Sequence, residues 1–333
     1  MSESSGQHPR LDQLVRVGLV AAIILPIITA VTRSLRTDWF PIGDNALLFI
    51  RARDVWTDHH PLLGSWTSAS LSLGEDVNNP GSMFDWLIAP WAHLLSPGPA
   101  AAVGVATINI GCVIGISVVA RRIGGWSFER VMLIVTAALT WSMGSELLID
   151  IWQANALILP FVLFLLMMLG LTVGDRALVP WALGVGTLLV QTHVSYAYIF
   201  FFLILGTAAA WVLHSRATDT DPVAAFRQGL RSRTTMVGVG VIAVLWAQPL
   251  IEQFFVEGKG NLARLISNSG GGELSLGPSA AVRIVSAVGV LPPWWARSGY
   301  ANTVRVTPLA NGELLIPGLP SLPLAVLTVV ALL

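Results

Sequence analysis

The sequence predicts an all-α polytopic membrane protein with about eight transmembrane helices. Of its 333 residues, 54% are hydrophobic and only 11% are charged, whereas about 25% of the residues in an average soluble domain are charged. The mean hydropathy is +0.71, and several apolar runs approach the roughly 20 residues that an α-helix needs to cross a bilayer. The net charge is zero, so the composition gives no indication of nucleic-acid binding, which relies on an excess of basic side chains.

The first predicted span covers residues 17–32, an apolar run that follows a polar N-terminus. It has no convincing small-residue cleavage site before Arg33, and we therefore expect a retained helix rather than a secretory signal. Arg10 and Arg16 precede the run, and basic residues beside a span favour the cytoplasmic side. The prediction is a multi-pass protein of the plasma (inner) membrane with its N-terminus in the cytoplasm.

The first extracytoplasmic loop is predicted to cover residues 33–99 and to contain two short juxtamembrane helices. Residues 44–57 place apolar and polar side chains at helical spacing, with Asp44 at the N-cap position. Residues 83–95 form an apolar run that is too short to span and is interrupted by Pro90. We expect both helices to lie on the membrane surface.

The later apolar runs supply seven further predicted spans. The pair Arg121 and Arg122, the residue Arg176 and the basic loop 214–233 then fall on the cytoplasmic side, as the positive-inside rule requires. The spans are residues 100–120, 128–143, 154–173, 178–190, 196–213, 235–249 and 314–333.

We expect residues 1–333 to form a single transmembrane domain, with a second large extracytoplasmic loop at residues 252–313. The sequence ends inside an apolar run that begins near Leu314. This ending predicts either a fragment of a longer chain or a short gene.

Acidic residues gather in the first loop of a chain that has only 19 of them, and such a cluster predicts the chemistry of a membrane protein to lie there. Asp44 is the leading candidate for a catalytic base. The sequence supports a role as the N-cap of a helix about equally well. Arg283 is a candidate for binding phosphate, or it snorkels from an interfacial helix. The candidates for substrate binding are Asp54, His60, Glu75, Asp76, Asn79, Asp150, Glu252 and Arg283.

The order of these features resembles the GT-C superfamily of integral-membrane glycosyltransferases, which includes protein O-mannosyltransferases and the lipid A aminoarabinose transferase. Asp44 falls where that family carries an Asp in its first loop. The segment NNPGSMFDWLIAP at residues 78–90 looks like the family's second loop helix, and ARRIGG at residues 120–125 looks like the end of its second span. The chain departs from the family at Asn45, where a second acid often stands, and the pattern is closer to actinobacterial members.

The resemblance implies a polyprenyl-phosphate sugar as donor and a cell-envelope glycan, lipid or protein as acceptor, with membrane lipid around the site. A carboxylate can take the proton of the acceptor hydroxyl or hold a divalent cation. The alternatives are a transporter or flippase of a lipid-linked sugar and a non-catalytic membrane scaffold. A transporter would carry more charges inside its spans and show internal repeats, whereas the acids here cluster in the predicted outer loops.

Overall fold

The computed structural model describes residues 9–67, 70–71, 74–256, 258–268, 277–289, 307–308, 314–315 and 320–332. The chain divides into two compact units, Met1–Ile266 and Ser267–Leu333. Helices dominate the described residues, as the composition predicts. The described residues leave out half of the expected loop 252–313, namely residues 257, 269–276, 290–306 and 309–313.

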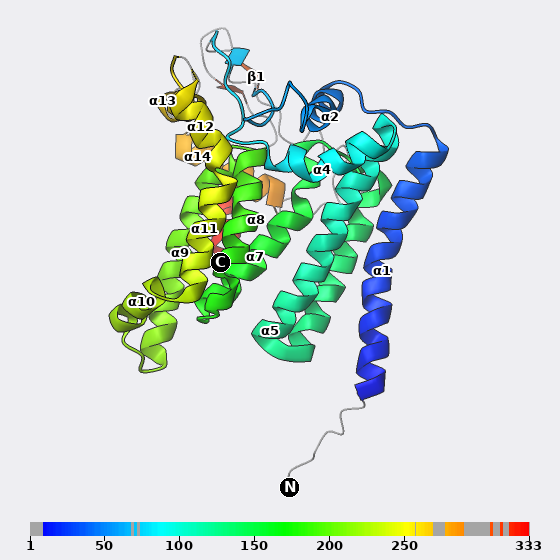
Figure 1. The fold of residues 1–333 in the computed structure, drawn as a ribbon. Coiled ribbons are helices and arrows are strands. Elements are labelled where there is room, and N and C mark those ends of the chain that lie inside the picture. The colour runs from blue at the N-terminus through cyan, green and yellow to red at the C-terminus, as the bar shows by residue number, and fades with distance from the viewer. Residues whose placement is uncertain are drawn as a thin grey trace. The chain divides into compact units, whose positions relative to one another are not determined.

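The first unit is a helical bundle, and Figure 1 shows its order along the chain. Its elements are α1 (Pro9–Arg36), α2 (Asp44–Asp54), α4 (Met83–Leu94), α5 (Pro97–Leu147), α6 (Gln153–Ala156), α7 (Ile158–Thr172), the 3-10 turn η1 (Arg176–Leu178), α8 (Val179–Thr192), α9 (Tyr196–Ala217), α10 (Pro222–Leu230), α11 (Arg233–Leu245), α12 (Ala247–Phe255) and α13 (Asn261–Asn268), whose last residues belong to the second unit.

The second unit contains two helices and a short antiparallel ladder among its described residues. The helices are α14 (Gly277–Gly289) and α15 (Leu322–Leu332), and the two-residue strands β1 (Thr307–Pro308) and β2 (Leu314–Leu315) pair with each other. The expected last span, residues 314–333, therefore begins with a strand. Its helix of 11 residues is shorter than the roughly 20 needed to cross a bilayer.

Four described helices are long and apolar enough to cross a membrane, and α11 with α12 would make a fifth if this pair, bent by 50°, is one span. The prediction of a helical chain with several helices apolar enough to span a membrane is therefore confirmed, while the membrane itself and the number eight stay predictions. The helix at the expected span 178–190, α8, has only 14 residues. The four helices are Leu11–Arg36, Pro97–Leu147, Gln153–Thr172 and Tyr196–Ala217.

The helix α5 is a hairpin of two arms rather than one rod. A straight helix of its 51 residues would be about 77 Å long at 1.5 Å per residue, against about 30 Å for a bilayer core. The backbone leaves helical geometry at Gly124 and Gly125, where Gly125 has a φ of +65°. Asn109 Nδ2 on the first arm donates to the carbonyl of Leu148, 39 residues later, at 2.9 Å. The arms occupy the positions of the predicted spans 100–120 and 128–143.

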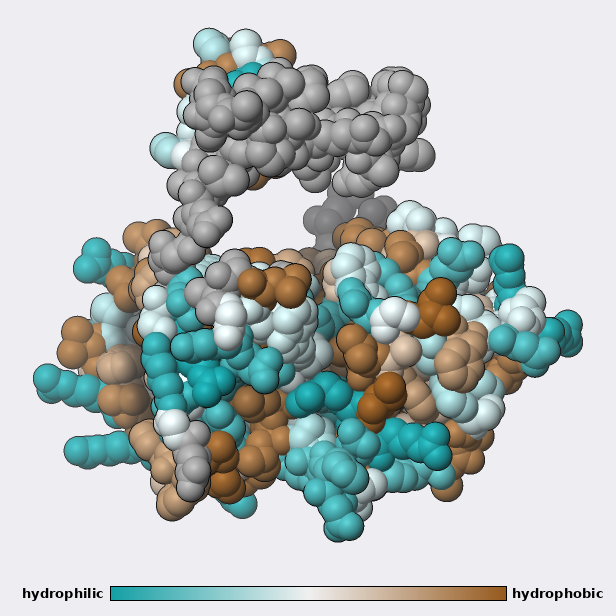
Figure 2. Space-filling model, turned by 90° about the horizontal axis from the view of Figure 1, so that it is seen from above, coloured by the Kyte–Doolittle hydropathy of each residue, from teal (hydrophilic) through white to brown (hydrophobic). Residues whose placement is uncertain are grey.

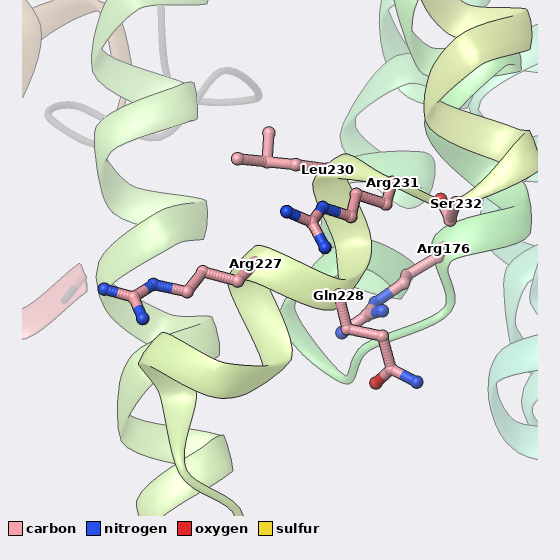
Figure 3. A pocket seen from close by; sticks show the side chains of 6 residues that line it. All are labelled: Arg176, Arg227, Gln228, Leu230, Arg231 and Ser232. Atoms are coloured by element: carbon pink, nitrogen blue, oxygen red, sulfur yellow. The ribbon is translucent and has the colours of Figure 1, made fainter.

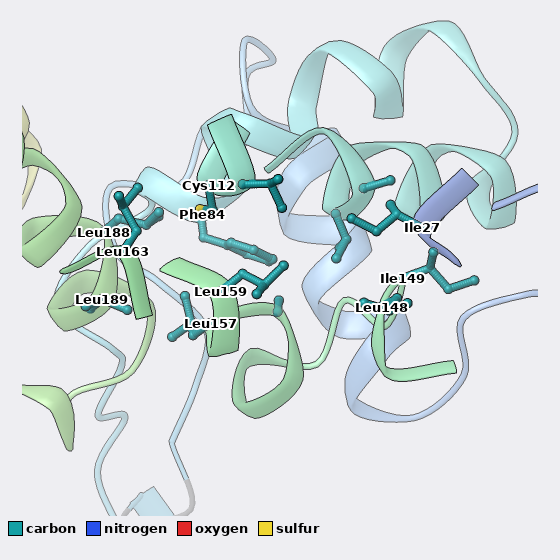
Figure 4. Close-up of a cluster of buried hydrophobic side chains, with 14 of the residues drawn as sticks. Ile27, Phe84, Cys112, Leu148, Ile149, Leu157, Leu159, Leu163, Leu188 and Leu189 are labelled. Carbon is teal, nitrogen blue, oxygen red and sulfur yellow. The ribbon is translucent and has the colours of Figure 1, made fainter. Parts of the chain in front are cut away.

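The core of the first unit lies where α1, α4, α5, α7 and α8 meet, and Figure 4 shows part of it. Fully buried side chains there include Ile23, Ile27, Leu159, Phe164 and Leu189. Large apolar residues also cover the outside of the bundle, as on α9, whose most apolar window has no buried residue. An apolar exterior is expected where lipid replaces water as the solvent.

The helices α2 and α4 pack against each other at one end of the bundle, where α1 and the second arm of α5 end (Figure 1). The predicted helices 44–57 and 83–95 are thus present as Asp44–Asp54 and Met83–Leu94. Leu48, Phe49 and Ala52 form the buried face of α2. Seen from above, this end carries hydrophilic residues among scattered apolar ones (Figure 2). That α2 and α4 lie on a membrane surface stays a prediction.

Ion pairs join the helices at the opposite end of the bundle. Glu129 is fully buried, and its carboxylate contacts Arg16 Nε of α1 at 2.7 Å and Arg121 Nη1 at 3.1 Å. Arg122 pairs with Asp175 through two hydrogen bonds of 2.9 Å. A buried carboxylate needs such partners because its desolvation is unfavourable. These pairs join α1, the turn of the α5 hairpin and the segment before η1.

Candidate functional site

A polar pocket of about 480 Å³ lies at the end of the bundle that carries α2. It is formed where α1 ends, α2 begins and the second arm of α5 ends. Its wall combines the basic Arg33 with the acidic Glu146 and Asp150. The remaining lining residues are Ala30, Ser34, Thr37, Trp39, Asn45, Ser145 and Ile149.

Asp150 is held by three hydrogen-bond donors. Asn45 Nδ2 donates to Asp150 Oδ1 at 2.7 Å, and the backbone N–H of Trp152 donates to the same oxygen at 3.0 Å. Asn155 Nδ2 donates to Oδ2 at 2.7 Å. No described basic residue forms an ion pair with this carboxylate. Its position is therefore fixed by neutral donors from α2 and from the start of α6. None of these donors carries a positive charge that would balance the carboxylate.

Arg33 and Ser34 form the α1 side of the pocket. The Arg33 guanidinium is exposed and donates to Ser145 Oγ at 3.3 Å. Ser34 Oγ is buried and has no hydrogen-bond partner in the described part of the chain, which is unusual for a buried polar atom. A second cavity of about 380 Å³ runs along α1 past Ile28 and Arg36 and shares Arg33 and Thr37 with the first. The two cavities thus adjoin at Arg33 and Thr37, and the second extends along α1 as far as Ile28.

Asp44 is not the N-cap of α2, so this prediction is wrong by one residue. Gly43 occupies the N-cap position with a φ of +57°, a conformation that favours glycine. Asp44 is the first residue of the helix and is exposed, and its carboxylate forms no hydrogen bond or ion pair with the described residues. It is the neighbour of Asn45, which lines the pocket. An acid in the first turn still suits the positive end of the helix dipole.

Three other predicted acids lie away from the pocket. Asp54 is the last residue of α2 and is half-buried. Glu75 and Asp76 are exposed in the loop before α4, where the backbone carbonyl of Asp76 accepts a hydrogen bond from Arg264 Nη1 at 2.7 Å. The structure does not bring these carboxylates to Asp150.

His60 and Asn79 fasten the first loop to later helices. Asn79 is buried, and its side chain donates to Ser65 and accepts from the backbone N–H of Val194 at 2.9 Å. His60 Nε2 lies 2.9 Å from Gln248 Nε2, and its ring lies edge-on to Trp86. Both predicted binding residues therefore have structural partners.

Glu252 and Arg283 also have backbone partners. Glu252 is buried, and both of its carboxylate oxygens accept from the backbone N–H of Asn261, at 3.2 and 3.0 Å, at the start of α13. Arg283 lies in the second unit, is half-buried, and donates from Nε to the carbonyl of Pro320 at 2.7 Å.

Asp85, which was not predicted as a site residue, lies on α4 with 3% of its surface exposed. Burial raises the pKa of its carboxyl from 3.8 to about 7, although the nearby Arg51 acts in the opposite direction. The feature of the sequence that could have identified Asp85 as a buried acid is its position within the apolar run 83–95. Arg33, Asn45 and Glu146 were not predicted as binding residues either, and only contacts between distant segments bring them together.

No three His, Cys, Asp or Glu side chains in the described part of the chain gather closely enough to hold a metal ion. Glu146 and Asp150 offer two carboxylates to a cation. No known protein family, curated protein or solved structure was found to match this chain, so a function must be argued from its own residues.

Proposed function

We propose that the protein is a membrane glycosyltransferase of the GT-C type. It transfers a sugar from a polyprenyl-phosphate donor to a cell-envelope glycan, lipid or protein on the extracytoplasmic face of the plasma membrane. The observation that supports this proposal best is the pocket at the end of α1. There Arg33, which forms no ion pair with the described residues, lines the same wall as the carboxylates Glu146 and Asp150.

The donor would bind with its phosphate at Arg33. A guanidinium binds phosphate oxygens through two parallel hydrogen bonds, and Arg33 has only the Ser145 hydroxyl as a side-chain partner among the described residues. Arg36 lines the adjoining cavity and adds positive charge. The prenyl chain would lie along the outer surface of α1, where Leu25 and Ile28 are exposed.

The acceptor would bind at Asp150 and lose its proton to Asp44. In the transfer, the acceptor oxygen forms a bond to the anomeric carbon, the bond from that carbon to the phosphate oxygen breaks, and the lipid phosphate leaves with the electron pair. The carboxylate of Asp150 already accepts three hydrogen bonds, which hold it in place to orient the acceptor. The carboxylate of Asp44 has no such donors among the described residues, so it can accept a hydrogen bond from the acceptor hydroxyl and take its proton. A divalent cation, if one is required, would bind at Glu146 and Asp150.

The proposed topology has eight spans, a cytoplasmic N-terminus, and α2 and α4 on the outer membrane surface. The basic residues Arg16, Arg121 and Arg122 lie at the end of the bundle opposite the pocket. Positive charge of this kind is typical of the cytoplasmic side, which would leave the pocket facing outward, where lipid-linked donors are used.

The test is sugar transfer by the purified protein in lipid vesicles, with a panel of polyprenyl-phosphate sugars and a cell-envelope extract as acceptor. Arg33→Gln should lower transfer roughly ten- to a hundredfold, because one charged hydrogen-bonding group is lost. Arg53→Gln removes the same charge from an exposed position on α2 and should have little effect. Translocation of the donor without transfer would favour a flippase, and the absence of both would leave a scaffold.

A further inference from the structure

A second, strongly basic pocket lies at the other end of the first unit, around the C-terminal end of α10. Its volume is about 1020 Å³, and three arginines line it without any acid. Figure 3 shows their side chains around this end of α10, with Arg227 reaching away from the other two. The lining residues are Arg176, Arg227, Gln228, Leu230, Arg231 and Ser232.

The positive charge of this pocket is not neutralised by the described acids around it. Asp175, the residue before Arg176, is paired with Arg122 at 2.9 Å. Asp221 caps α10 through the backbone N–H of Val223, also at 2.9 Å. Within the described residues, neither Arg227 nor Arg231 forms an ion pair. The pocket is therefore complementary to an anion.

Arg176 is held in place for such a ligand. Its Nη2 donates to the carbonyl of Ala225 at 2.7 Å, and its guanidinium lies so close to α10 that a Cβ on Gly229 would be 3.4 Å from Arg176 Cζ. A fixed guanidinium loses less side-chain entropy on binding than a mobile one.

An apolar pocket of about 390 Å³ adjoins the basic one and shares Arg176 and Leu230 with it. It runs between α7, α8, α9, α10 and α11. Its wall is almost wholly apolar and includes Phe164, Met168, Phe200, Trp211 and Phe226. A soluble anion would occupy only the basic pocket. An amphiphile would fill both, with its anionic headgroup in the basic pocket and its apolar chain in the apolar pocket, here called the apolar slot.

We propose that the two adjoining pockets bind one anionic membrane phospholipid. Its phosphate lies against Arg176 and Arg231, and one acyl chain enters the slot between α7 and α9. Basic pockets between transmembrane helices are a general means of binding anionic lipid headgroups. This site is separate from the polar pocket at Arg33, and it does not depend on the glycosyltransferase proposal.

The experiment measures retention of phosphatidylglycerol by the full chain, using native mass spectrometry and the shift in Tm on addition of the lipid. Arg231→Gln should weaken binding about tenfold, because a charge-assisted contact to phosphate is lost. The matched control is Arg233→Gln, which removes the same charge two residues later, at the exposed first residue of α11 and outside the pocket. Phosphatidylcholine is the control lipid and should be retained less.

A second variant separates lipid from free phosphate. Ala208 lines the apolar slot but not the basic pocket, so Ala208→Trp should abolish retention of phosphatidylglycerol while leaving the arginines in place. Inorganic phosphate should produce no shift in Tm. Equal losses of phosphatidylglycerol binding in Arg231→Gln and Arg233→Gln would overturn the proposal and indicate a non-specific attraction of anionic lipid to the basic segment. Binding of inorganic phosphate that survives Ala208→Trp would overturn it and indicate a site for a soluble anion.

Discussion

Two carboxylates at the same end of the bundle, Asp44 and Asp150, have opposite surroundings. Asp150 accepts three hydrogen bonds from Asn45, Trp152 and Asn155, whereas Asp44 is exposed and has no described partner. Both were predicted as site residues from the sequence. The contact that relates them, from Asn45 to Asp150, joins residues 105 positions apart, and a local sequence pattern holds no information on such a pair.

Asp44→Asn is expected to abolish sugar transfer and to leave the Tm unchanged. The exposed carboxylate supports no described contact, while a general base contributes about 10²–10⁴-fold to the rate. Because Gly43 is the N-cap, Asp44→Ala should also leave the Tm nearly unchanged. An active Asn variant would transfer the proposed role of base to Glu146 or Asp150.

Asp85 makes stability depend on pH. Its pKa is raised from 3.8 to about 7 by burial, so the folded protein binds this proton more tightly than the unfolded chain does. The stabilisation is complete below about pH 4 and is lost as the pH rises through about 7. The difference in Tm between Asp85→Asn and the wild type should therefore shift in favour of the variant between pH 5 and pH 8. Thermal melts in detergent measure this, with the exposed Glu75→Gln as control; parallel curves for Asp85→Asn and wild type would contradict it.

At the scale of elements, the polar pocket depends on how the chain enters α5. Trp39 lines the pocket, and its carbonyl lies so close to Gly98 at the start of α5 that no Cβ fits between them. The helices α2, α4 and α5 were located from hydrophobic spacing to within a few residues. The end of α2 and the cap at Gly43 were not, because backbone conformation at such positions is set by packing between elements.

Gly98→Ala is expected to lower the free energy of unfolding by about 1–3 kcal/mol, the usual cost of overpacking, because the added methyl group would overlap with the backbone of Trp39. Gly111→Ala is the matched control on the first arm of α5, where no atom lies within 4 Å of the added Cβ. Its Tm should be unchanged or slightly higher. Chemical denaturation in mild detergent measures the free energy of unfolding of both variants. Equal free energies for Gly98→Ala and Gly111→Ala would contradict the close contact between Trp39 and Gly98.

At the scale of the molecule, composition was enough to predict a helical membrane protein, because apolar length is a property of each segment alone. The number of spans is harder to read. Two predicted spans form the two arms of α5, which meet at the non-helical Gly124 and Gly125, and α11 and α12 form a pair bent by 50°. Residues that bind one another across the bundle, such as Arg16 and Glu129, have no signature in the sequence.

Labelling of single cysteines is expected to find Thr220 and Glu75 on opposite sides of the membrane. Both positions are exposed. Thr220 lies between α9 and α10, within the basic segment 214–233, and Glu75 lies in the loop before α4. The native Cys112 is buried and serves as the background in Thr220→Cys and Glu75→Cys. An impermeant reagent added to intact cells should label only Glu75→Cys; labelling of both from outside would reverse the assignment of the basic loop.

The ion pairs of Glu129 also bear on the order in which the chain is made. Synthesis proceeds from the N-terminus, so Arg16 on α1 and Arg121 on the first arm of α5 have both left the ribosome before Glu129 follows. The cations are thus already available when the acid arrives, and at no stage must the nascent chain carry an uncompensated carboxylate toward the lipid.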